Sequence, residues 1–339
     1  MTNSSRDQVE VEELTEHLNH QVVAPIAGLA SSLKKWAKDL EKQGLKDDAP
    51  SLVREQNSFV LSVARGIQSI RTSFQEGNDV TTEYVLEELN ENYIPSLVKC
   101  SDKINLIADE YKEARTGEFD GCRRQAAQCI RLLRNVYYSS SEIELKFLQL
   151  GDFGRIIRLG YLAAVQDSGY EKREIEDVLE VDRDGYHRTL SFGDYYRLSE
   201  VFLNFIDNSI KYAGADNELK INIRLMSVDR EAISQYVGAN SLARADSYMV
   251  IDYWDNGGGI QKNEAHKVFE KGKRGEGVKR TLQGIGYGLY YCRKVILAHG
   301  GAIYVRFPEK KDQNRWMIRI VLPLFLSRSA AEESLKTVS

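Results

Sequence analysis

The spacing of apolar residues in the first half of this 339-residue chain constrains its fold more than any other feature. From residue 14 onward an apolar residue recurs every three or four positions, which places one apolar stripe along a long amphipathic helix. The stripe consists of Leu14, Leu18, Val22, Ile26, Leu29, Leu33, Trp36 and Leu40. The same spacing returns over 60–74 and, after an expected break at Pro95, over 97–111, and a fourth helical run leads from about Cys122 towards Leu150. The first half is therefore predicted to be a bundle of long helices.

The pattern changes after about residue 151, where helical runs alternate with short runs rich in β-forming residues. Such alternation is typical of layered α/β architecture, with the helix over 198–212 and the helix after Gly288 on one face of a mostly antiparallel or mixed sheet. We therefore expect an α+β protein of two domains. The predicted parts are a helical domain over 1–150 with an inserted helical segment at about 47–118, a second domain over 151–326, and a polar, frayed tail over 327–339.

Composition excludes several classes of function. The net charge of −4 gives no electrostatic reason to expect nucleic acid or an anionic membrane as a partner. The four cysteines form no CxxC pair, which favours buried thiols in a reducing compartment over a zinc site. No run approaches the roughly 20 apolar residues that span a bilayer, and no internal repeat is visible. We expect a cytoplasmic protein without a membrane span.

Three segments of the second half carry residues suited to a nucleotide. In the first, Asn204 and Asn208 lie four residues apart and therefore one above the other on a helix face. An Asn carbonyl is a neutral oxygen ligand that suits Mg²⁺ when phosphate oxygens and waters fill the remaining positions. Lys211 can add a positive charge for the phosphates, and Tyr212 can lie against a base.

The second segment follows an apolar strand and contains Asp255, Gly257, Gly259 and Ile260. It predicts a strand followed by a turn with no side chains in the way. A carboxylate at this place accepts a hydrogen bond from the exocyclic amine of adenine, whereas guanine would set one acceptor against another.

The third segment contains Gly284, Gly286, Gly288 and Leu289, and it opens a predicted helix. Glycines at a helix N-terminus present bare N–H groups and the positive end of the helix dipole to phosphate. Each segment alone is weak, but the three in this order, with a stretch rich in Lys and Gly over 271–279, predict a nucleotide site. The chain has no GxxxxGK motif and is therefore no P-loop enzyme.

These segments resemble the nucleotide-binding boxes of the superfamily that joins histidine kinases, DNA gyrases, heat-shock chaperones and mismatch-repair ATPases, and those of histidine kinases most closely. The matching boxes are the N box at 204–212, the G1 box at 255–260, a variant F box at 268–275 that includes Arg274, and the G2 box at 284–289. The resemblance covers about residues 150–323. It implies a Bergerat-type α/β sandwich that binds ATP, with Asn208 as the Mg²⁺ ligand, Asp255 as the adenine reader and residues 270–284 as a mobile lid.

The resemblance also separates transfer from hydrolysis. Hydrolysing members of the superfamily carry a glutamate base at the position matched here by Asn204. An amide cannot act as that base, so the resemblance implies phosphoryl transfer to a side chain more than hydrolysis. Glu200, one turn earlier, is the residue that would otherwise take this role.

His20, five residues before Pro25, resembles the phosphoacceptor in the H box of histidine kinases. On a helical wheel His20 lies about 200° from Leu18 and Val22, which predicts a solvent-facing position opposite the apolar stripe. The chain departs from the family at Gln21, where an acidic residue usually takes up the imidazole proton. An amide can orient the ring but is no useful base.

The helix over 123–137 resembles the second helix of the dimerisation hairpin of these kinases. The segment between it and the His20 helix is much longer than the short loop that the family has there. Either the bundle has gained two helices, or the partner of the His20 helix is the run over 52–76 and the rest is a separate module.

The leading hypothesis is an ATP:protein-histidine phosphotransferase that forms a homodimer through its N-terminal helices. It would pass phosphate from His20 to an aspartate of a response-regulator receiver domain, with a possible separate sensor protein. The alternatives are an ATP-gated conformational device, a nucleotide-binding scaffold or regulator without transfer, and a kinase for serine on another protein, for which His20 would be irrelevant.

Overall fold

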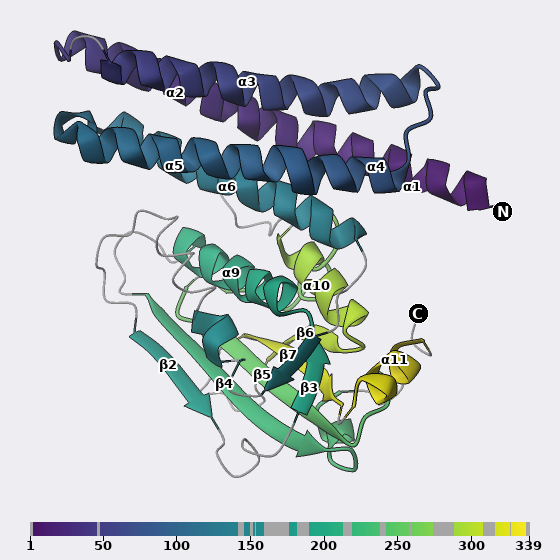
Figure 1. Cartoon of the computed structure of the whole chain (residues 1–339). Coiled ribbons are helices and arrows are strands. Elements are labelled where there is room, and N and C mark those ends of the chain that lie inside the picture. The colour runs from purple at the N-terminus through teal and green to yellow at the C-terminus, as the bar shows by residue number, and fades with distance from the viewer. Residues whose placement is uncertain are drawn as a thin grey trace. The chain divides into compact units, whose positions relative to one another are not determined.

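The chain divides into two compact units, Met1–Ser141 and Glu142–Ser339, each considered by itself (Figure 1). The computed structural model describes residues 3–45, 48–141, 146–149, 152, 154–158, 176–181, 190–212, 219–237, 242–257, 259–273, 288–307, 316–325 and 327–336. Among these residues no helix combines the length and the apolar character that crossing a bilayer requires.

The helical unit is an antiparallel bundle of four arms (Figure 1). The first arm comprises α1, η1 and α2 over 3–42, the second is α3 over 48–75, the third comprises α4, η2 and α5 over 82–110, and the fourth is α6 over 117–140. Its elements are α1 (Asn3–Leu18), the π-helical turn η1 (Asn19–Val23), α2 (Ala24–Lys42), α3 (Asp48–Gln75), α4 (Thr82–Glu87), the π-helical turn η2 (Glu88–Tyr93), α5 (Ile94–Glu110), the short 3₁₀ helix η3 (Lys112–Ala114) and α6 (Gly117–Ser140). The arm containing α2 packs against α3 and α6, and the arm containing α5 packs against the same two helices. The arms therefore close into a ring, so of the two alternatives the structure favours a bundle that has gained two helices.

The arms that contain Pro25 and Pro95 each pass through a π-helical turn. The turn η1 precedes Pro25, and η2 precedes Pro95. Proline removes one backbone hydrogen bond and its ring clashes with the carbonyl four residues earlier, and a wider π-helical turn accommodates both effects. The expected break at Pro95 is therefore wrong, and the distortion before Pro25 takes the form of a π-helical turn.

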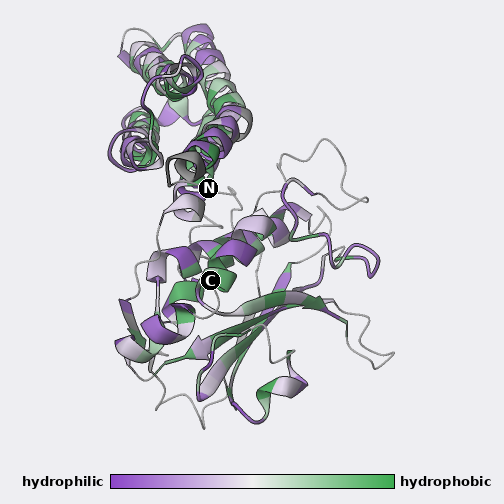
Figure 2. Ribbon diagram, turned by 90° about the vertical axis from the view of Figure 1, so that its right-hand side faces the viewer, coloured by the Kyte–Doolittle hydropathy of each residue, from purple (hydrophilic) through white to green (hydrophobic). Residues whose placement is uncertain are grey.

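The predicted stripe forms the core of the bundle. Each of its eight residues is at most 3% exposed. Trp36 is fully buried, its Nε1 donates to the carbonyl oxygen of Ala114 at 3.0 Å, and its ring centroid lies 5.5 Å from that of Phe119. Figure 2 looks nearly along the bundle, where each arm carries both hydrophilic and hydrophobic residues. Burial of this stripe is the main term that stabilises the unit.

The helix predicted to run towards Leu150 ends earlier. It stops at Ser140, and Ser141 has extended backbone angles. Three successive serines stand at this end in the sequence, and serine favours a helix less than alanine or leucine does. Strand β1 (Lys146–Gln149) follows and pairs antiparallel with β3 (Leu190–Gly193), so these residues belong to the second unit.

The second unit contains a five-stranded mixed sheet in the order β2-β4-β5-β7-β6 (Figure 1). The strands are β2 (Glu176–Val181), β4 (Lys220–Asp229), β5 (Ser247–Asp255), β6 (Ala302–Arg306) and β7 (Met317–Leu324). Strands β2 and β4 run parallel, and the other neighbours run antiparallel, which confirms the predicted mixed sheet. Helices α9 (Tyr195–Tyr212) and α10 (Gly288–Ala298) pack against each other on one face, where Phe205 contacts Tyr253 with ring centroids 5.2 Å apart.

The opposite face of the sheet carries a second apolar cluster. Tyr248 and Val250 point to this face because side chains alternate along a strand, and both pack in a cluster with Ala331 of α11 (Arg328–Lys336). Ala331 is fully buried, and Ser334 Oγ donates to the carbonyl oxygen of Arg244 at 2.7 Å. The expectation of a frayed tail is therefore wrong over 328–336, because this helix has an apolar face to bury.

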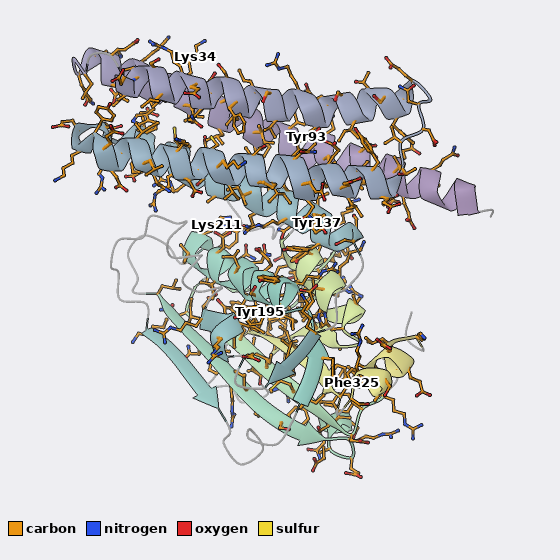
Figure 3. All side chains as sticks on the ribbon, in the orientation of Figure 1. Lys34, Tyr93, Tyr137, Tyr195, Lys211 and Phe325 are labelled. Carbon is orange, nitrogen blue, oxygen red and sulfur yellow. The ribbon has the colours of Figure 1, made fainter. Side chains whose placement is uncertain are left out.

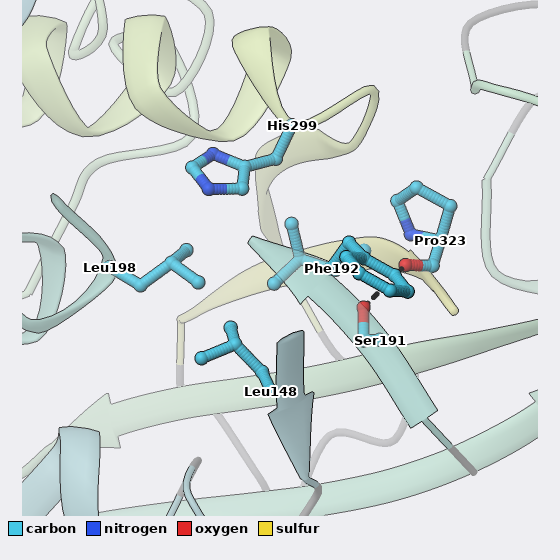
Figure 4. A pocket seen from close by; sticks show the side chains of 7 residues that line it. Leu148, Ser191, Phe192, Leu198, His299 and Pro323 are labelled. Atoms are coloured by element: carbon cyan, nitrogen blue, oxygen red, sulfur yellow. Dashed lines mark hydrogen bonds between the residues drawn. The ribbon is translucent and has the colours of Figure 1, made fainter. Parts of the chain in front are cut away.

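A small cavity in this unit lies beside His299 (Figure 4). It is lined by Leu148, Ser191, Phe192, Leu198, His299, Leu322 and Pro323, and so by none of the predicted nucleotide residues. His299 is buried, its Nε2 accepts from the Asp194 N–H at 2.9 Å, and its Nδ1–H donates to the carbonyl oxygen of Val295 at 2.7 Å. The bond accepted by Nε2 requires the neutral ring, and the bond to Val295 places its proton on Nδ1, so His299 has a structural role.

His299 is expected to make the stability of this unit depend on pH. Burial lowers the pKa of His299 below its ordinary value of 6.5, so the unfolded chain binds a proton as the pH falls through 6.5 while the folded chain does not. The free energy of unfolding should therefore decrease below pH 6.5, by up to about 1.4 kcal/mol per pH unit for one proton. Urea titrations at about pH 7.5 and pH 5.5 measure this. His299→Gln should decline less steeply, and an equal decline in both proteins would contradict the assignment.

Candidate nucleotide-binding site

The N-box residues lie on α9. Asn204 is 5% exposed, and its Nδ2 donates to the carbonyl oxygen of Glu200 at 2.8 Å. This bond fixes the amide and turns its Oδ1 away from Glu200. Asn208 and Tyr212, each one helical turn further on, are half-buried and thus accessible to a ligand.

Asp255, the last residue of β5, is joined to α9 by hydrogen bonds. It is 7% exposed, its Oδ2 accepts from Ser209 Oγ, and its Oδ1 accepts from the Gly257 N–H at 2.8 Å. The hydroxyl oxygen of Tyr253 lies 2.6 Å from Ser209 Oγ and extends this network. Burial raises the pKa of Asp255 above its ordinary value, against the opposing effect of the two hydrogen bonds. Each carboxylate oxygen keeps a further lone pair for a ligand amine.

The turn after β5 depends on the absence of side chains. Gly259 has a φ of +73°, and a methyl group placed on it would lie 2.3 Å from Cδ1 of Trp316. Another residue would be both strained and obstructed there. Gly257 and Ile260 in the same turn are half-buried. The turn therefore presents backbone to its surroundings.

The N-terminus of α10 lies against Asn204. A methyl group placed on Gly288 would lie 2.9 Å from Asn204 Oδ1. A second contact between the two helices joins Cys292 Sγ to the carbonyl oxygen of Val201 at 3.7 Å. Leu289, the second residue of α10, is half-buried. Helix α9 thus connects residues of all three predicted segments.

Gly288→Ala is expected to weaken ATP binding about tenfold, because the added methyl displaces the Asn204 amide. Alanine favours helix by about 1 kcal/mol over glycine, so lost folding is not the expected cause. Titration calorimetry measures the affinity. The matched control is Gly121→Ala on α6, where a methyl group meets nothing within 4 Å. Equal ATP affinity in wild type and Gly288→Ala would contradict a role for this contact.

Lys211 lies at the end of α9 (Figure 3) and forms an ion pair with Asp207 one turn earlier. The side chains of Lys211 and Asp207 are 33% and 11% exposed. Phosphate oxygens would therefore compete with Asp207 for the ammonium group. The phosphate contact of Lys211 stays a prediction.

Part of the predicted site lies outside the described residues. Arg274, Gly284 and Gly286 all do, as does most of the proposed lid. Phe269 of the F box is described and is 4% exposed, so this end of the segment is anchored in the unit.

The predicted phosphoacceptor is described only in its backbone. His20 and Gln21 lie in η1, and their side chains fall outside the description. Their neighbours Leu18 and Val22 are 1% and 0% exposed, so the stripe runs through this turn. The solvent-facing orientation of His20 stays a prediction.

A metal site built by protein side chains alone is not found in the described parts of the chain. No group of three or more His, Cys, Asp or Glu residues is placed there to hold an ion. Asn208 offers a neutral amide oxygen on an accessible helix face. Such a ligand fits an ion whose other ligands come from phosphates and water.

Sequence reasoning missed three residues of this site. Ser209 binds Asp255, and its position directly after Asn208 gave no sign of that contact. Asp207 pairs with Lys211, and their four-residue spacing on a helix was an available signal. Trp316 packs against Gly259 from a distant part of the chain, and no local pattern indicates it.

Comparison with known proteins bears on the same region. Residues 193–325 match the family described as histidine kinase-, DNA gyrase B-, and HSP90-like ATPase. The chain is 30% identical over 115 residues to the sensor protein KdpD of Escherichia coli (strain K12), an alignment that covers 34% of this chain and 11% of KdpD. It is 28% identical over 114 residues to the adaptive-response sensory kinase SasA of Prochlorococcus marinus (strain AS9601), covering 34% and 26% of the two chains.

Other matches extend further along the chain. The SasA of another Prochlorococcus marinus strain is 23% identical over 272 residues, which cover 74% of this chain and 66% of that protein. A solved structure of the mycobacterial sensor histidine kinase MprB matches 54% of this chain and 99% of that one, with 23% identity and a TM-score of 0.38. The chain spans about a tenth to a quarter of the length of KdpD and of the first SasA.

Proposed function

Because residues 193–325 belong to the histidine kinase-, DNA gyrase B-, and HSP90-like ATPase family, we propose that the chain is a histidine protein kinase that phosphorylates His20 with Mg-ATP. The observation that carries this proposal is the assembly around α9. Ser209 ties that helix to Asp255, and Asn204 lies against Gly288 at the start of α10. Residues for the base and for the phosphates are thereby held on one scaffold.

Each described residue then has a chemical task. Asp255 accepts a hydrogen bond from the exocyclic amine of adenine through the lone pairs left by Ser209 and Gly257. The N-terminus of α10 directs its N–H groups and positive dipole end to the phosphates. Asn208 would hold Mg²⁺, which neutralises charge on the phosphates when bound.

Asn204 favours transfer over hydrolysis. Its amide donates to the Glu200 carbonyl and has no basic group to activate water. The acceptor in this proposal is His20, whose ring nitrogen attacks the γ-phosphorus while the bond to the ADP oxygen breaks. Gln21 can orient the ring but cannot take its proton. We further propose that an aspartate of a response-regulator receiver domain receives the phosphoryl group, with input from a separate sensor protein.

The test is incorporation of label from γ-labelled ATP into the purified protein. We expect label in the presence of Mg²⁺ and none after chelation with EDTA. Asn208→Ala should lose label because it removes the proposed metal ligand, whereas Asn105→Ala, a half-buried amide of the helical unit, should retain it. ATP binding without any label in wild type would contradict the kinase and leave a nucleotide-binding scaffold.

A further inference from the structure

The arms that contain Pro25 and Pro95 repeat each other. Both pass through a π-helical turn that leads into a helix with a proline in its first turn, and the tetrapeptide Leu18–Gln21 is matched there by Leu89–Asn92. The first two residues are identical in both, Leu followed by Asn. When Leu18 is aligned with Leu89, Glu91 occupies the place of His20, and Pro95 lies one position before the place that matches Pro25. The match is too short to be recognised as a repeat without the helices around it.

Burial supports the same register. The alignment of Leu18 with Leu89 also pairs buried positions along the rest of the arm, and both members of each of these pairs are at most 3% exposed. The pairs are Leu14 and Val85, Leu18 and Leu89, Ile26 and Leu97, Leu29 and Cys100, Leu33 and Ile104, Trp36 and Ile107, and Ala37 and Ala108. Each of these two arms is followed by one long helix, α3 or, after the short η3, α6. The bundle therefore consists of two hairpins of the same order, the first over 3–75 and the second over 82–140.

The second hairpin covers the apolar stripe of the N-terminal helices, through which the sequence predicts a homodimer. Helix α2 packs against both α3 of its own hairpin and α6 of the other. At one end Trp36 bonds to Ala114 and packs on Phe119. These contacts are all made within one chain, and they leave the stripe at most 3% exposed.

The first and second hairpins also meet in a seam between α3 and η2, where the packing depends on a glycine. Gly66 of α3 faces Tyr93 of η2, and a methyl group placed on Gly66 would lie 2.8 Å from the Tyr93 hydroxyl oxygen. Figure 3 labels Tyr93 within the bundle. Burial, with Glu88 nearby, raises the pKa of Tyr93, as expected for a phenol packed in this seam.

The outer surface offers little for a second copy. The large apolar side chains that are exposed in the described part of this unit are Val9, Leu61, Tyr84 and Leu106. They come from four different helices, α1, α3, α4 and α5. Single exposed apolar residues are normal on a monomer surface.

We propose that the hairpin over 82–140 takes the place of a second subunit. A single chain then forms the whole bundle, with one acceptor at His20 and Glu91 at the matching position of the other arm. The chain works as a monomer, and phosphoryl transfer occurs within one chain. The statement about transfer rests on the proposed kinase function, whereas the statement about the bundle does not.

The proposal that one chain forms the whole bundle is tested by the molecular mass of the protein in solution. Light scattering after size exclusion should give the mass of one chain, 38.6 kDa, at both low and high protein concentration. The thermal midpoint should likewise not change with concentration, because unfolding of a monomer is unimolecular. A mass of two chains, or a midpoint that rises with concentration, would overturn the proposal. Neither the mass nor the thermal midpoint depends on kinase activity, so both measurements test the proposal even if ATP does not label the protein.

The seam is tested by a substitution. Gly66→Val should lower the thermal midpoint on the order of 5 °C more than Gly121→Val, since both place a β-branched residue in a helix but only the first meets Tyr93. Equal effects of the two changes would count against packing of the second hairpin on the first.

Transfer within one chain is tested by mixing two inactive variants. His20→Ala lacks the acceptor and Asn208→Ala lacks the proposed metal ligand, and the two would be co-expressed with different tags. Wild type should be labelled and the mixture should not, because neither chain has both parts. Label on the Asn208→Ala chain would overturn transfer within a chain. Failure of wild type to be labelled would instead refute the kinase function.

Discussion

Asp255→Asn is expected to weaken ATP binding on the order of 100-fold, or about 2.7 kcal/mol. The carboxylate already accepts from Ser209 and Gly257, and it still has lone pairs for the adenine amine. The amide has one oxygen in place of two, so one of these donors loses its acceptor. An amide N–H facing the adenine amine would also set donor against donor.

The same substitution should leave the unit close to wild type in stability. Burial raises the pKa of Asp255, which means that the fold disfavours the charged form. A neutral amide removes this cost, which offsets the loss of one hydrogen bond from Ser209 or Gly257, so we expect the free energy of unfolding to stay within about 1 kcal/mol of wild type. Calorimetric titration with ATP, beside a urea titration, measures both quantities.

Asp229→Asn is the matched control, since Asp229 is exposed at the end of β4. It should bind ATP as wild type does. GTP should bind neither wild type nor control, because its keto oxygen faces the carboxylate. Unchanged ATP affinity in Asp255→Asn would show that adenine is read elsewhere.

His20→Ala is expected to reduce incorporation of label from γ-labelled ATP to background, a loss of at least about 100-fold, because alanine has no nucleophile. ATP affinity should not change, since His20 lies outside the family match over 193–325. His17→Ala is a suitable control, because it removes an imidazole three residues earlier on the same arm. Label that persists in His20→Ala, or that disappears only in His17→Ala, would show that the phosphoacceptor is a residue other than His20.

The sequence was most informative about features that depend on residues close together in the chain, such as an apolar stripe along one helix or a short motif. The stripe from Leu14 to Leu40 predicted a buried helix face, and the structure buries all of it. The short runs of the second half predicted the mixed sheet and the two helices on one face. Asp255 and Asn204 could be selected because each sits in a motif whose chemistry is local.

Contacts between distant segments could not be predicted in the same way. A stripe with three-four spacing is the same whether another chain or a later part of its own chain covers it. The closure of the bundle by α6 therefore had no signature in the stripe. Likewise, Trp316 meets Gly259, and Ala331 joins the second apolar cluster, only because of how the sheet is ordered.

The measurement that tests the central claim most directly is the chemical stability and position of the label on wild-type protein. After incubation with γ-labelled Mg-ATP, the protein would be exposed to mild acid or to alkali and then digested for peptide mapping. The account predicts label that is lost in acid, survives alkali and lies in the peptide that contains His20. Label that survives acid, or that lies in a peptide without His20, would contradict it.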